Sequence, residues 1–172
     1  LALFESHIRP ATEWDTLSLP VKQLATLLDC PDSGYKAIIE QNYLVRKLLP
    51  SCSVTPLSQK ALDYYAKPFT TQASRKVLWR YIQDLPLGDS NSEVTSLIDD
   101  YSSWLTTSSI PKLLLYAVPG FITTLETVSW AKDNLSSLTL SPLDDVMHFA
   151  QESVPELFSE KLKIWYKTKV VN

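Results

Sequence analysis

Two residues at opposite ends of the sequence carry side chains that together could perform general-base chemistry. Glu5 ends a short apolar run at the start of the chain, and His148 lies in a loop near its other end. A carboxylate beside a histidine fixes the imidazole tautomer and stabilises the imidazolium, so the pair can take a proton from water. The residues alone leave a structural alternative open, in which Glu5 pairs with Arg9 and His148 caps the last helix.

The same residues offer little for a metal ion. Glu5 and His7 are two residues apart and would share one face of a continuing strand. No third ligand follows at a suitable spacing, and His148 is the only other histidine. We therefore expect no metal and no cofactor. Glu152 follows His148 by four residues, the spacing of neighbours on a helix, but we expect it to lie in a solvated turn.

The elements that would position these residues alternate between strand and helix. We expect strands at residues 1–5, 112–118 and 138–141, a loop at 142–145, and helices at about 94–105, 125–134 and 155–167. This alternation is typical of a parallel α/β sheet, in which ligands bind outside the carboxyl ends of the strands. Glu5 and His148 would meet there.

The region between the first two strands contains short helical patterns separated by prolines. Apolar spacing predicts one helix from Gly34 to Leu49 that Pro50 stops. Ser58 is expected to cap another helix, which Pro68 ends. We infer one α/β body interrupted by a helical insertion.

Composition excludes several classes of protein. The only glycines, at 34, 88 and 120 of 172 residues, are too far apart for a Walker A loop, a dinucleotide fold or a nucleophile elbow. The net charge of −3 argues against nucleic acid as a partner, and no apolar run approaches a membrane span. Cys30 and Cys52 flank a helix of about 24 Å, so both should be free thiols. Free thiols suit a reducing compartment, which favours the cytoplasm.

Three segments carry a family resemblance. Residues 146–156 read Val-Met-His-Phe-Ala-Gln-Glu-Ser-Val-Pro-Glu, residues 110–120 read Ile-Pro-Lys-Leu-Leu-Leu-Tyr-Ala-Val-Pro-Gly, and residues 4–10, followed by Trp14 and Asp15, read Phe-Glu-Ser-His-Ile-Arg-Pro. In this order they resemble the catalytic-histidine loop, the penultimate strand and the glutamate-bearing strand end of the haloalkane dehalogenases. Further matches between residues 40 and 80 follow the family's order through its helical cap, so the resemblance covers essentially the whole chain.

The resemblance implies an α/β-hydrolase fold and a two-step hydrolysis of a small, apolar, halogenated substrate. An aspartate displaces halide and forms an ester, which histidine-activated water then cleaves. By position, His148 resembles the base and Glu5 the acid supporting it, a placement shared with the subfamily that includes Renilla-type luciferase. The positions that match a substrate pocket, or else ordinary core, are Phe121, Ile122, Met147, Phe149 and Tyr43.

The resemblance also implies that the chain is the C-terminal half of such a hydrolase, with its last three parallel strands. Residues 1–10 would then be a core strand, 11–88 the cap, and 89–172 the rest of the core. The nucleophile and the halide-binding residues would lie upstream. Because the first strand would leave an unpaired edge, we expect the chain to require its N-terminal half, as a second chain or an upstream segment.

Two positions depart from the family's pattern. Val146 stands where the family has glycine, and Ser153 where it has aspartate, changes that could shift the imidazole or loosen its loop. They motivate a non-catalytic relative as one alternative. Tyr43, Tyr64 and Tyr65 leave an epoxide hydrolase open, because such enzymes protonate the epoxide with cap tyrosines. A Renilla-type luciferase is the third alternative.

Overall fold

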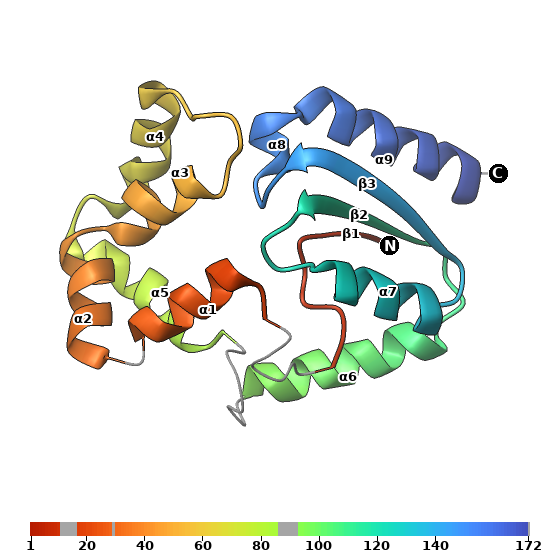
Figure 1. Ribbon diagram of the computed structural model, residues 1–172, viewed down its shortest axis with the longest axis horizontal. Helices are drawn as coiled ribbons and strands as arrows, with labels where there is room; N and C mark the ends of the chain where they lie inside the picture. Colours follow the sequence, from red (N-terminus) through yellow and green to blue (C-terminus); the bar gives the residue numbers. More distant parts are fainter. Residues whose placement is uncertain (11–16, 29, 86–92, 172) are drawn as a thin grey trace.

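The computed structural model describes residues 1–10, 17–28, 30–85 and 93–171. Within them, a parallel sheet with flanking helices lies on one side, and a group of short helices lies on the other (Figure 1). The expected domain boundaries fall at residues 11, 88 and 89, which lie outside the described residues, as do Trp14 and Asp15.

The sheet consists of β1 (Ala2–Phe4), β2 (Lys112–Pro119) and β3 (Leu138–Val146), in that spatial order and all parallel. Leu3 of β1 pairs with Leu114 of β2, which pairs with Leu140 of β3. The central strand is buried from Lys112 to Leu115, and the apolar run that begins at Leu113 is typical of a strand in a sheet covered on both faces. The expected α/β class with three parallel strands is confirmed.

Alternate residues of β2 enter two separate cores. Leu113, Leu115 and Ala117 pack with Trp165, on the face covered by α8 (Ala150–Ser153) and α9 (Pro155–Lys169). Leu114 packs on the other face, beneath α6 (Glu93–Thr107) and α7 (Leu125–Asn134). Successive side chains of a strand point to opposite faces, so β2 contacts a layer of helices on each side of the sheet (Figure 1).

The third strand is longer than its sequence suggests. The expected strand at residues 138–141 continues through the expected loop to Val146, so that prediction was wrong. Pro142 pairs with Tyr116 at an edge of the described sheet, where a missing N–H is tolerated. Leu143 and Val146 are completely buried. The strand therefore leads directly to His148.

The helical layer, defined as described residues 17–28 and 30–85, contains many short helices. They are α1 (Leu19–Leu28), α2 (Pro31–Tyr35), the π-helices η2 (Lys36–Glu40) and η3 (Leu44–Leu48), α3 (Leu49–Ser51), α4 (Gln59–Ala66), the 3-10 helix η4 (Lys67–Phe69) and α5 (Gln72–Gln83). Ser58 caps α4 as expected, since its Oγ accepts from Ala61 N–H at 3.2 Å. Arg75 ties this layer together by donating to the carbonyls of Ile39, Glu40, Phe69 and Thr70.

The helix expected from Gly34 to Leu49 is interrupted. Asn42 adopts φ of +55°, a left-handed conformation that asparagine tolerates, and its amide donates to Phe69 O at 3.2 Å. Pro50 does not stop the segment either, because it lies inside α3. Cys30 and Cys52, at the two ends of this stretch, are both free thiols, as expected. None of the described helices is long and apolar enough to cross a membrane.

Candidate active site

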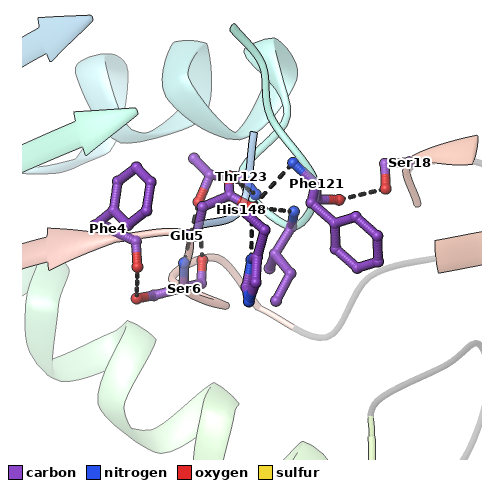
Figure 2. A network of polar contacts seen from close by, with 8 residues as sticks. Phe4, Glu5, Ser6, Ser18, Phe121, Thr123 and His148 are labelled. Carbon is purple, nitrogen blue, oxygen red and sulfur yellow. Dashed lines mark hydrogen bonds and ion pairs between the residues drawn. The ribbon is translucent and has the colours of Figure 1, made fainter. Parts of the chain in front are cut away.

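Glu5 stands in the turn where β1 ends. Its backbone has φ of +44°, which turns the chain sharply out of the strand. The Thr123 hydroxyl stabilises this turn with two hydrogen bonds. Ser6 N–H donates to Thr123 Oγ1 at 3.1 Å, and Thr123 Oγ1 donates to Ser6 O at 3.3 Å. The Glu5 side chain is thereby aimed at the loop after β2 (Figure 2).

That loop surrounds the carboxylate with backbone donors. Glu5 Oε2 accepts from the N–H groups of Phe121 and Ile122 at 2.9 and 2.8 Å, and Oε1 accepts from Thr123 N–H at 3.3 Å. Gly120 permits this arrangement with φ of +73°, and a Cβ there would lie 2.7 Å from Thr123 O. Three converging N–H groups make the carboxylate a fixed acceptor despite its burial.

His148 completes the network. Its Nδ1 lies 3.0 Å from Glu5 Oε2, and the side chains are 27% and 2% exposed respectively. Because a carboxylate only accepts, Nδ1 must be the protonated nitrogen at this contact, and in the neutral tautomer Nε2 carries the lone pair. The imidazole is held edge-on against Phe149, with centroids 4.7 Å apart. The structural alternative is thus wrong: Glu5 pairs with His148, and Val154 rather than His148 occupies the N-cap of α9.

A cavity of about 240 Å³ opens beside the imidazole. Phe121, Ile122 and Phe149 line it together with His148, and the helical layer supplies most of the remaining wall, chiefly through aliphatic side chains. The layer is also attached to this loop directly, since Ser18 Oγ donates to Phe121 O. The space is therefore a small, largely apolar site with the imidazole of His148 at its edge.

A second cavity of about 200 Å³ contains the two other predicted pocket residues. Tyr43 and Met147 line this space and not the one beside His148. Leu48, Cys52 and Phe121 are among the residues that line both cavities and so separate them. The five predicted pocket positions therefore divide between two adjoining spaces.

Three residues with polar groups, His7, Cys52 and Tyr81, line the first cavity without having been predicted to do so. Burial lowers the pKa of His7, an effect that nearby Glu5 opposes and His148 reinforces, so His7 favours the neutral form. Burial raises the pKa of Cys52 to about 11, which keeps its thiol protonated. The signal available for His7 is its position two residues from Glu5, which suggests only the start of a metal site and leads to the expectation of no metal. No group of three or more metal-ligating side chains occurs among the described residues.

The two departures from the family's pattern are accommodated. Val146 packs in the core with Leu143 and Ala150, while His148 still meets Glu5. Ser153 Oγ lies 3.0 Å from Ser53 Oγ in the helical layer, so the loop after the histidine is attached there. The expected solvated turn at Glu152 is wrong, because its carboxylate accepts a hydrogen bond from Tyr65.

Comparisons with known proteins agree with this architecture. No family model matches the chain. A haloalkane dehalogenase of Agrobacterium fabrum strain C58 is 30% identical over 165 residues, which cover 96% of this chain and 54% of that protein. A haloalkane dehalogenase of Mycolicibacterium smegmatis is 30% identical over 156 residues, which cover 87% of this chain and 48% of that protein.

A solved structure shows the same similarity in three dimensions. The haloalkane dehalogenase DatA from Agrobacterium tumefaciens C58 superposes with a TM-score of 0.83 at 30% identity, over 96% of this chain and 57% of that one. The chain spans about half the length of the curated relatives it matches. Over nearly all of its residues, in sequence and in fold, it is homologous to the haloalkane dehalogenases and shares their α/β-hydrolase fold.

Proposed function

We propose that this chain supplies the base, the acid and the cap of a haloalkane-dehalogenase-like hydrolase. His148 activates water, and Glu5 orients and stabilises the imidazole. The observation that carries the proposal is the 3.0 Å contact between His148 Nδ1 and a carboxylate that three backbone N–H groups hold in place. The imidazole also borders an apolar cavity, which a purely structural pair would not need.

The reaction takes two steps that together consume one water. An aspartate outside these 172 residues attacks the alkyl carbon, and the halide leaves with the bonding electrons. His148 Nε2 then takes a proton from water, and the resulting hydroxide adds to the carbonyl carbon of the ester. Glu5 stabilises the positive imidazolium until the intermediate collapses, when the departing alkoxide takes the proton from His148 and leaves as the alcohol. The aspartic acid that remains loses its proton to solvent, which restores the carboxylate.

The apolar cavity supports a small, apolar substrate, and the resemblance to haloalkane dehalogenases supports a halogenated one. Its wall beside His148 is formed by Phe121, Ile122 and Phe149, which offer no charge to a bound molecule. The missing part of the site is the nucleophile and the groups that hold the halide. We propose that the N-terminal half supplies them and that its neighbouring strand covers the open edge of β1, which pairs only with β2 among the described residues.

The three cap tyrosines named from the sequence give little support to an epoxide hydrolase, whereas Tyr81 of α5 does line the cavity beside His148. Tyr43 lines the second cavity, Tyr65 donates to Glu152, and Tyr64 is 75% exposed. None of these three lines the cavity beside His148, so none is placed to protonate an epoxide there.

The test uses the protein expressed from its complete coding sequence. Wild-type protein should release halide repeatedly from short bromoalkanes, whereas His148→Phe should release at most one equivalent and accumulate a covalent alkyl adduct visible by mass spectrometry. Styrene oxide and coelenterazine are assayed in parallel. Absence of halide release from the wild type would contradict the proposal, and turnover of either other compound would favour the corresponding alternative.

A further inference from the structure

The segment that follows His148 is attached to the helical layer by three hydrogen bonds. Phe149 N–H donates to Cys52 O at 3.4 Å, and Ser153 Oγ lies 3.0 Å from Ser53 Oγ. Tyr65 donates its hydroxyl to Glu152 Oε1. These partners are about 90 to 100 residues apart in the sequence, so the contacts join two separate parts of the fold.

This segment is short, and among its residues Ala150 anchors it in the core of the sheet, with Leu143 and Val146. α8 comprises only Ala150–Ser153, and its N-cap residue Phe149 provides no side-chain hydrogen bond. A single helical turn is marginal without tertiary contacts. On the other side of His148, β3 is fixed by pairing with β2 up to Val146. The histidine thus lies between a strand fixed by pairing and a short helix that is held by the core, through Ala150, and by the helical layer.

The Tyr65–Glu152 contact is suited to hold the segment after His148 in one orientation. Both side chains are partly buried, and Glu152 raises the pKa of Tyr65 to about 12, so the phenol stays a donor throughout the neutral range. Ser53 and Ser153 are also partly buried, and their pairing involves no charge. Neither contact uses a group that could serve the two reaction steps.

We propose that Tyr65 and Ser53 are positioning residues, which act through Glu152 and Ser153 to hold the loop of His148 in its working orientation. The inference rests on the proposed function. Glu5 fixes only Nδ1, and a rotation about that contact would move Nε2 away from the water it must deprotonate. Small displacements of this kind reduce rates strongly, because a base works only within hydrogen-bond reach.

The experiment compares Tyr65→Phe, Ser53→Ala and the double variant in the complete protein, with Tyr64→Phe as the matched control at an exposed neighbouring tyrosine. Alkylation does not use His148, so the single-turnover halide burst should stay unchanged. The rate of ester hydrolysis should fall about tenfold in each single variant and further in the double variant. Tyr64→Phe should leave both rates unchanged.

A conservative rescue separates positioning from general stability. Glu152→Gln keeps an oxygen that can accept from Tyr65 and should retain most of the hydrolysis rate, whereas Glu152→Ala should resemble Tyr65→Phe. If Tyr65→Phe and Ser53→Ala leave ester hydrolysis within twofold of wild type, the proposal is overturned. It is also overturned if they slow the halide burst and ester hydrolysis equally.

One readout does not depend on turnover. The Nδ1 proton of His148, identified by its disappearance in His148→Phe, should give a downfield proton resonance that broadens through faster solvent exchange in Tyr65→Phe. An unchanged resonance contradicts the inference even in a protein without activity. Conversely, a wild type that releases no halide while this resonance responds as expected would remove the proposed function and keep the positioning role.

Discussion

Replacing Glu5 with glutamine tests the role of the acid while preserving the shape of its side chain. Oε2 accepts from Phe121, Ile122 and His148, whereas among the described residues Oε1 accepts only from Thr123, at 3.3 Å. The glutamine oxygen should therefore take the Oε2 position, and its amide nitrogen should face Thr123 N–H. One buried bond becomes a donor–donor contact, at a cost of about 1–3 kcal/mol in the free energy of unfolding.

The larger effect is on the reaction. The glutamine oxygen still accepts from Nδ1, so the tautomer is kept, but the imidazolium loses a charge held 3.0 Å away in a side chain that is only 2% exposed. General-base catalysis contributes about 10²–10⁴-fold in enzymes. We expect ester hydrolysis to slow by about 10²–10³-fold, which corresponds to about 3–4 kcal/mol of transition-state stabilisation.

Rapid-quench measurement of bromide release, with mass spectrometry of the covalent adduct, separates the two steps in the complete protein. Glu5→Gln should keep the halide burst and accumulate the ester. Glu126→Gln makes the same chemical change at an exposed carboxylate in the first turn of α7 and should behave as wild type. Ester hydrolysis within threefold of wild type in Glu5→Gln would refute the assigned role of the acid.

Two further predictions concern stability. Burial lowers the pKa of His7 below 6.5 in the folded protein. As the pH falls, His7 therefore takes up a proton more readily in the unfolded chain than in the folded one. The contribution of His7 should then lower the free energy of unfolding by at most about 1.4 kcal/mol per pH unit as the pH falls. Urea titrations between about pH 7 and 5 should show a shallower dependence of this free energy on pH in His7→Gln than in wild type. The same dependence in both proteins would argue against a neutral buried His7. Gly120→Ala should cost about 2–5 kcal/mol, because a left-handed alanine is strained and its Cβ would lie 2.7 Å from Thr123 O. Urea unfolding checks this value, and a loss below 1 kcal/mol would mean that the loop relaxes around the methyl group.

Local signals predicted several elements well. Leu125–Asn134 is helical as expected, with Thr124 at its N-cap, and Ser58 caps its helix as its side chain suggests. Local signals failed at residues whose backbone conformation depends on the segments packed around them. Pro142 suggested a loop but lies in an edge strand, and Asn42 breaks a helix by adopting φ of +55°.

The sequence by itself determined the α/β class, the parallel strands and the identity of the candidate acid and base. Hydrophobic periodicity, helix caps and the order of motifs are properties of the sequence itself, so they can be identified without a structure. Which residues touch was decided only by the tertiary structure. Glu5 and His148 are 143 residues apart, and the partner of Glu152 lies 87 residues away, in the helical layer. Such contacts arise because packing of the sheet and the helical layer brings distant segments together, and no local propensity encodes that meeting.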